Sequence, residues 1–274
     1  MKLIQFLVLA VAVGASPPVI AHEMFLKPKD HTIPPGSTAT IKLVNGTFYR
    51  SENVIDRDRM RDVTIYGGGK IRHPLGDQWR DQGLATILTQ DALDSGTYAI
   101  GVSTMPRDFS MTRDSFIKYL RHEGVMDTLA DFQANSTLEN VRERYAKHVR
   151  TIVQVGETRS DEYGRAFGYP VEILLETNPH DADVGDEVGF QVLRNGVPLP
   201  GQLVYASYGG YHAHNAEGDH ERAISLRTDA DGQAGFTVST SGIWYLTLIH
   251  MEARENDPDV DYESNWATLT FAIN

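Results

Sequence analysis

Two stretches of the chain alternate apolar and polar residues with the two-residue period of β-strands. The first contains STATIKLVNGTF (37–48), DVTIYGGGKI (62–71) and GTYAIGVST (96–104). The second contains VGDEVGFQVLRNGVPLPGQLVYASY (184–208), AISLRTDADGQAGFTVSTSGIWYLTLIHME (223–252) and SNWATLTFAIN (264–274). Short strands separated by turns at these intervals are typical of β-sandwiches. The pattern predicts a mainly β protein with two β-sandwich-like domains, the second immunoglobulin-like.

Between these stretches the period changes. SFIKYLRHEGVMDTLADF (115–132) and TLENVRERYAKHVRTIVQV (137–155) carry apolar residues three and four positions apart, which predicts two helices. His148 falls inside the second predicted helix, where a packing or capping role is expected. The predicted organisation is therefore an N-terminal β domain (22–106), a short helical insert (107–155) and a C-terminal immunoglobulin-like sandwich (156–274).

Residues 1–21 have the three parts of a secretory signal peptide. Lys2 is followed by the apolar run LIQFLVLAVAVGA, and Val19 and Ala21 occupy the small-residue positions of a cleavage site. We expect cleavage after Ala21; cleavage after Ala15 and a retained anchor are the alternatives. No second apolar segment of membrane length follows in the sequence. We therefore expect a periplasmic protein without direct membrane insertion after cleavage.

Composition narrows the function classes. The chain has 25 Lys and Arg against 37 Asp and Glu, a formal net charge of −12, and no cysteine. An acidic surface argues against nucleic acid or anionic lipid as the main partner. The absence of cysteine excludes disulfides, thiolate metal sites and thiol catalysis. Histidine and carboxylate remain as candidate metal ligands.

Cleavage after Ala21 would make His22 the first residue. Its α-amine and imidazole Nδ1 could then chelate one ion, and a second imidazole would complete a site of three nitrogen ligands. Such a site suits copper best and nickel next, because the affinity of nitrogen ligands peaks at copper. The alternative is an ordinary exposed terminal residue.

Three further groups of candidate ligands lie in the predicted C-terminal sandwich (156–274). His212 and His214, in YGGYHAHN, would point to the same face of a strand, although a polar loop that merely contains histidines is the alternative. His250 ends an apolar strand and shares a face with Leu246 and Leu248; a core histidine is the alternative there. Glu252 is its expected partner or co-ligand.

Several segments resemble a family of bacterial periplasmic proteins of unknown function. These are AHEMFLKP, YLRHEGV, RERYAKHVRTIVQVG, VEILLETNP, TDADGQAGFTV and LIHMEAR…DYESNWATLTF, spread over almost all of the predicted mature chain. The family is grouped with the periplasmic components of cobalt and nickel ABC-type uptake systems. The resemblance implies a two-domain periplasmic protein, a metal-transport role and a membrane permease complex as partner. It implies no catalytic residues.

Three functions remain open at this point. The first is a periplasmic metal-binding protein that supports uptake of nickel, cobalt or copper or buffers the ion. The second is a non-catalytic β-sandwich module for adhesion or binding. The third is a copper oxidase that uses the terminal-histidine chelate. No Gly-x-Ser-x-Gly motif is present, and no serine stands out as a nucleophile. We expect a metal-binding protein that is not an enzyme.

Overall fold

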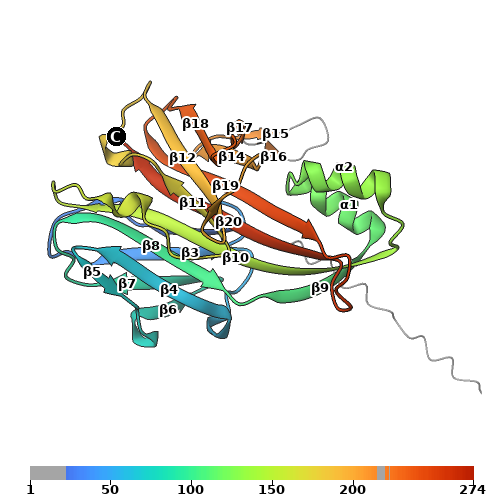
Figure 1. Ribbon diagram of the computed structural model, residues 1–274. Helices are drawn as coiled ribbons and strands as arrows, with labels where there is room; N and C mark the ends of the chain where they lie inside the picture. Colours follow the sequence, from blue (N-terminus) through green and yellow to red (C-terminus); the bar gives the residue numbers. More distant parts are fainter. Residues whose placement is uncertain (1–22, 215–219, 222) are drawn as a thin grey trace, which may run out of the picture.

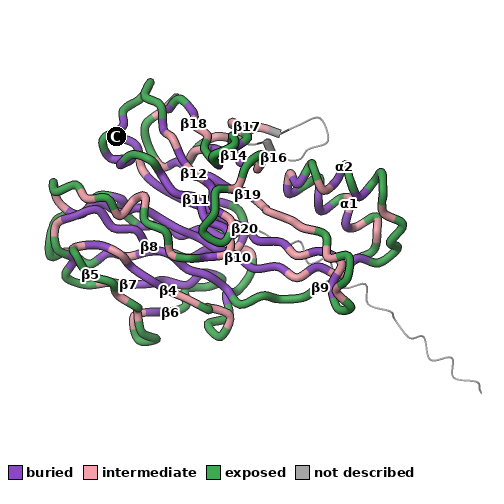
Figure 2. The backbone as a smooth tube through the Cα atoms, viewed as in Figure 1, coloured by how far each residue is buried: buried purple, intermediate pink, exposed green. Residues whose placement is uncertain are grey.

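A ten-stranded mixed sheet forms the centre of the molecule. The computed structural model describes residues 23–214, 220–221 and 223–274. In spatial order the sheet contains β17 (Ile224–Arg227), β14 (Leu203–Tyr208), β19 (Gly242–Ala253), β20 (Tyr262–Ile273), β10 (Asn140–Val155), β8 (Gly96–Thr104), β4 (Met60–Gly67) and β5 (Lys70–Arg72), and β2 (Thr32–Ile33) and β9 (Arg107–Thr112) also pair with β10. Figure 2 shows that the central strands β8, β10 and β20 are buried over most of their length.

Two smaller sheets cover this central sheet (Figure 1). The N-terminal sheet consists of β1 (Met24–Pro28), β3 (Ala39–Asn45), β7 (Ala85–Gln90) and β6 (Trp79–Gln82). The C-terminal sheet consists of β11 (Val171–Leu175), β12 (Glu187–Arg194), β13 (Val197–Pro198) and β18 (Gln233–Thr237). The remaining elements are the β15 (Ala213–His214) and β16 (His220–Glu221) ribbon and the 3-10 turns η1 (Arg57–Arg59), η2 (Gly76–Gln78), η3 (Asp161–Gly164) and η4 (Pro179–Asp181).

The two smaller sheets lie on opposite faces of the central sheet. Val149 and Val153 of β10 belong to the apolar core beneath the N-terminal sheet, whereas Ile152 belongs to the core beneath the C-terminal sheet. Successive side chains of a strand point to opposite faces, so one strand contributes to both cores. The mainly β, sandwich-like prediction is confirmed, and strands from both predicted sandwich domains pair in one continuous sheet.

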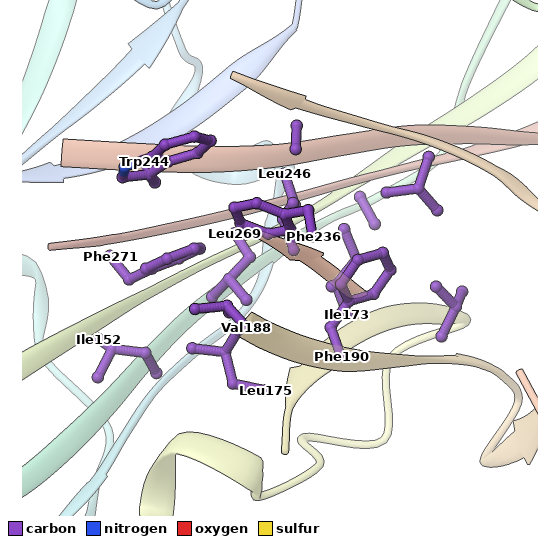
Figure 3. Packing of buried hydrophobic residues seen from close by; sticks show 14 of the residues in the cluster. Ile152, Ile173, Leu175, Val188, Phe190, Phe236, Trp244, Leu246, Leu269 and Phe271 are labelled. Atoms are coloured by element: carbon purple, nitrogen blue, oxygen red, sulfur yellow. The ribbon is translucent and has the colours of Figure 1, made fainter. Parts of the chain in front are cut away.

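The core beneath the C-terminal sheet is built around large side chains of the central strands. Trp244 and Leu246 of β19 and Phe271 of β20 pack against Ile173 and Phe190 of the facing sheet (Figure 3). All five are at most 1% exposed. The burial of a side chain of this size contributes about 1.5–3 kcal/mol of hydrophobic free energy.

Two helices, α1 (Arg113–His122) and α2 (Met126–Asn135), follow β9. Thr112 caps α1 through its side-chain oxygen, which accepts a hydrogen bond from the backbone nitrogen of Ser115. The helices pack on the far ends of β10 and β20 through a cluster that includes Phe116, Leu120, Phe132, Tyr145, Tyr262 and Trp266. Neither helix is long and apolar enough to cross a membrane, and the same holds for every helix in the described part of the chain.

The prediction of a second helix over residues 137–155 is wrong. Residues 140–155 form β10, which pairs in parallel with β20 and antiparallel with β8 and β9. Val141, Tyr145 and Val149 recur every four residues, a spacing that matches one face of a helix and also one face of a strand. The β-branched residues in the second half of the segment favour the strand. His148 accordingly lies in the middle of a buried strand.

Candidate functional site

A cleft of about 240 Å³ separates the turn between α1 and α2 from the edge of β19. β14 pairs with β19 only as far as Thr247, so the next residues of β19 present their edge to the cleft. The polar side chains around it are those of Glu23, Glu123, Asp127, Thr128, Gln202, Tyr205, Thr247 and His250. The lining therefore combines a histidine with three carboxylates.

A hydrogen bond and an ion pair hold the helices that form one wall of the cleft. The hydroxyl of Tyr205 donates a hydrogen bond of 2.8 Å to the carbonyl oxygen of Gly124. Gly124 has a φ of +74°, and a Cβ there would lie 2.7 Å from the same hydroxyl. Glycine is required at this position for both reasons. Arg227 and Asp127 form an ion pair of 2.7 Å that ties β17 to α2.

His250 has the orientation that the sequence predicts. Leu246 and Leu248 lie in the core beneath the C-terminal sheet, and Ile249 packs with the helices on the opposite face. The Nδ1 atom of His250 is 3.0 Å from Oε1 of Gln202. The amide nitrogen of Gln202 donates to two backbone carbonyl oxygens, so its oxygen must face the imidazole. Nδ1 therefore carries the proton and Nε2 keeps its lone pair.

That lone pair points toward an acidic neighbour. Nε2 of His250 is buried and forms no hydrogen bond to any described residue, and it lies 3.4 Å from Oε1 of Glu252. Burial lowers the pKa of His250. Burial is the largest single influence on the pKa of Glu252 and raises it, but the 2.6 Å hydrogen bond from Arg194, the charge of Arg194 and the neighbouring His250 together lower it. At neutral pH an unprotonated imidazole nitrogen thus faces a carboxylate, and both groups can bind a cation.

The start of the described chain lies at the same cleft. Glu23 lines the cleft, and its carbonyl oxygen accepts a hydrogen bond of 2.8 Å from the backbone nitrogen of Gly46. Next to Gly46, the side chain of Asn45 accepts a hydrogen bond from the buried Lys147, whose pKa burial lowers to about 7. His22 lies outside the described residues, but it is joined to Glu23 by one peptide bond.

The His-x-His pair is only partly described. His212 is exposed, and its ring stacks on Tyr49 with 4.9 Å between centroids. His214 lies in β15, where its backbone pairs with that of His220. That either residue shares an ion with His22 remains a prediction. Among the described residues, no group of three or more His, Asp or Glu side chains is arranged to hold a metal ion.

Sequence reasoning missed two residues that organise the site. Gln202 fixes the tautomer of His250, and Arg194 holds the carboxylate of Glu252. Gln202 lies in the loop before β14, and Arg194 is the last residue of β12. They are 48 and 58 positions away from the residues they contact. No local pattern in the sequence indicates that the fold brings them together.

Solved structures with some similarity were found. The D0-D1 domain of intimin is 10% identical, with 90% of this chain and 96% of that chain covered and a TM-score of 0.22. The adhesin InvE of Yersinia pseudotuberculosis is 14% identical, with 93% and 61% covered and a TM-score of 0.22. A DUF4785 family protein of Legionella pneumophila is 9% identical, with 81% and 51% covered and a TM-score of 0.25. At these TM-scores the similarities support no functional inference.

Sequence comparison identifies the family. No curated protein matches the sequence. One family model, described as Domain of unknown function (DUF4198), matches residues 19–252, which include the N-terminal strands, both helices and β19 as far as Glu252. The match covers most of the chain, and the chain therefore belongs to the DUF4198 family.

Proposed function

We propose that this protein binds a divalent transition metal ion, nickel, cobalt or copper, at the cleft beside His250. The ion would be held in the periplasm, and the protein would support its uptake through a membrane permease or buffer it. This function agrees with the resemblance to proteins grouped with cobalt and nickel uptake systems. The described residues that support it are His250, Glu252 and Gln202.

One observation carries the proposal. The imidazole of His250 presents an unprotonated, buried Nε2 that forms no hydrogen bond within the described part of the chain and lies 3.4 Å from a carboxylate oxygen of Glu252. Metal-binding histidines characteristically donate their other ring nitrogen to an oxygen acceptor, as Nδ1 does here to Gln202. An unpaired nitrogen acceptor beside an anionic oxygen is unfavourable in a buried site. A cation bound to both atoms would remove that cost.

The remaining ligands would come from the N-terminus. Two ligands are too few for nickel or cobalt, and the described part of the chain offers no third one in place. Glu23 lines the same cleft as His250, and His22 precedes it directly. If export ends with cleavage after Ala21, the α-amine and Nδ1 of His22 become available as a chelating pair. This donor set of three nitrogens and one carboxylate suits copper and nickel.

The test is a calorimetric titration of two forms of the chain with nickel, cobalt and copper. The first form is purified by its secretory route, and its N-terminus is confirmed by sequencing. The second is produced in the cytoplasm with one methionine in front of His22, so that it keeps every side chain and lacks the terminal-histidine amine. We expect tight binding by the first form alone. Equal binding by both forms would contradict the role of the amine.

Two substitutions then separate the proposed ligands from adventitious histidines. We expect His250→Ala to weaken binding by more than the roughly 10–100-fold that loss of an outer-shell partner causes. His73→Ala is the matched control, because His73 is exposed and lies beyond β5, away from the cleft. Absence of binding in the parent would favour a non-catalytic binding module. Turnover of a reductant by the copper-loaded form would favour an oxidase.

A further inference from the structure

A second polar group lies buried on the face of the central sheet that the C-terminal sheet covers. Ser103 of β8, His148 of β10 and Asn265 of β20 come from three adjacent strands and are at most 3% exposed. Nδ1 of His148 is 2.9 Å from Oγ of Ser103, and Nε2 is 3.0 Å from Oδ1 of Asn265. One imidazole thus connects a hydroxyl to an amide oxygen.

The hydrogen bonds determine which ring nitrogen carries the proton. The side-chain nitrogen of Asn265 donates to Oε1 of Glu263 at 3.4 Å, which leaves its oxygen facing His148. Nε2 of His148 therefore donates to Asn265, and Nδ1 accepts the hydroxyl proton of Ser103. Burial lowers the pKa of His148 to about 4, so the ring is neutral at pH 7. This is the protonation state of a general base that is oriented by a third group.

Ser103 adjoins a cavity that is distinct from the cleft at His250. The cavity has a volume of about 390 Å³, and Ser103 lines it together with Arg61, Asp62, Phe167, Tyr169 and Asn195. The pairing of β4 with β8 shifts register between Met60 and Asp62, so Arg61 is the extra residue of a β-bulge. Bulges are frequent beside active sites because they redirect a side chain. Here the bulge places Arg61 at the wall of the cavity that Ser103 also lines.

The opposite wall of the cavity is rigid. Glu172 accepts hydrogen bonds of 2.8, 2.7 and 3.0 Å from the backbone nitrogens of Phe167, Gly168 and Tyr169. The hydroxyl of Tyr169 donates a 2.6 Å hydrogen bond to Asp62, and its ring lies beside that of His148 with 5.8 Å between centroids. The loop at this wall of the cavity is therefore held beside His148.

We propose that Ser103, His148 and Asn265 form a nucleophilic triad that hydrolyses small carboxylic esters. Oγ of Ser103 attacks the ester carbonyl carbon while its proton passes to Nδ1 of His148. The bond from that carbon to the alcohol oxygen then breaks, and the departing oxygen takes the proton. Water attacks the acyl group in the same way, which releases the acid and restores the serine. Arg61 stabilises the negative charge that develops on the carbonyl oxygen.

The cavity limits the substrate class. About 390 Å³ accommodates an acyl group of a few carbons with a small alcohol, but not a polymer chain. Phe167 and Pro170 supply the apolar part of the lining, and the polar part comes from Arg61, Asp62, Tyr169 and Asn195. The geometry favours a short-chain ester whose carbonyl oxygen faces Arg61.

A fluorophosphonate probe tests the nucleophile directly. Serine attack on its phosphorus releases fluoride and leaves a covalent adduct whose position peptide mass spectrometry determines. The reaction is run with a chelator, so that metal-bound hydroxide makes no contribution. We expect one adduct per chain, on Ser103, and hydrolysis of p-nitrophenyl acetate that falls at least about 100-fold in Ser103→Ala.

Ser207→Ala is the matched control. Ser207 is also a fully buried serine of a central-sheet strand, and its hydroxyl has no hydrogen-bond partner among the described residues. This variant should keep both the adduct and the ester hydrolysis. Absence of an adduct on Ser103 in the unmodified protein would overturn the proposal, whether or not the variants fold. Hydrolysis that persists in a folded Ser103→Ala variant would also overturn it.

Discussion

The Nε2 atom of His250 lies 3.4 Å from Oε1 of Glu252 and forms no hydrogen bond to the described residues. Gln202 holds the imidazole proton on the other ring nitrogen, and Arg194 binds the other carboxylate oxygen. The fold thus maintains two electron-pair donors side by side, and one of them, His250, lines a cleft that also has three carboxylates in its lining. This arrangement is the main structural support for a cation at the site.

The first prediction concerns the group that orients His250. Gln202→Ala removes the acceptor at Nδ1, so the imidazole can adopt the other tautomer and rotate. We expect metal affinity, measured by calorimetry, to fall about 10–100-fold. Gln191→Ala is the control, because the side-chain amide of Gln191 donates to the backbone oxygen of Asp231 and does not contact His250. An unchanged affinity in Gln202→Ala would exclude His250 as a ligand in this tautomer.

The second prediction concerns the helical wall of the cleft. Gly124→Ala combines a left-handed backbone with a contact of 2.7 Å to Tyr205, whereas Gly69→Ala, at a φ of +67°, meets open space. We expect Gly69→Ala to cost about 1–2 kcal/mol of unfolding free energy. Gly124→Ala should cost more and should also weaken metal binding. Urea denaturation measures the difference; equal losses would show that the Tyr205 contact adjusts freely.

The third prediction concerns acid stability. Burial lowers the pKa values of His31, His148 and His180 from 6.5 to about 4. Between these values the unfolded chain binds protons that the folded chain does not, so stability falls as the pH falls from 6.5 to 4. Burial raises the pKa of Glu143 to about 7. This group has the opposite effect, because it makes the folded state more stable as the pH falls from 7 to 4.5.

The three histidines outweigh the one glutamate, so we expect a net loss of folding stability on acidification. The steepest slope should be about 3 kcal/mol per pH unit, which corresponds to two net protons. Chemical denaturation at pH 7, 5.5 and 4.5 measures it. Stability that stays constant or rises across this interval would contradict the buried, neutral state of these histidines.

The fourth prediction concerns the loop over the second cavity. Arg150 and Glu172 form a buried ion pair at 3.4 Å with side chains 2% and 1% exposed. Glu172→Gln leaves the guanidinium unpaired and weakens the three backbone contacts of the loop. We expect a loss of about 3–5 kcal/mol. The matched exposed pair is Arg144 with Asp108, and Asp108→Asn should cost no more than about 1 kcal/mol in thermal unfolding.

The local features of this fold follow from short sequence patterns. Asn195 and Gly196, a residue pair typical of hairpin turns, form such a turn with positive φ values, and Asp229–Gly232 forms the turn between β17 and β18. The face of His250 follows from strand alternation alone. The periodicity of apolar residues failed for residues 137–155, because apolar residues four positions apart fit both a helix and a strand. The β-branched residues favour the strand, and pairing with β8 and β20 stabilises it.

The contacts that give the sites their chemistry were not predictable in the same way. Ser103 and His148 are 45 positions apart, and His148 and Asn265 are 117 apart. Each becomes a neighbour only through the register of the central sheet. A pattern of single residues contains no information about that register, so the sequence indicated candidate ligands but not the groups that orient them.

The most direct test of the account is anomalous diffraction from crystals of the secreted protein with nickel or copper bound. The account predicts a single strong peak within bonding distance of Nε2 of His250 and Oε1 of Glu252, with the terminal amine of His22 completing the coordination. A peak at another position, with Nε2 of His250 unligated, would contradict it.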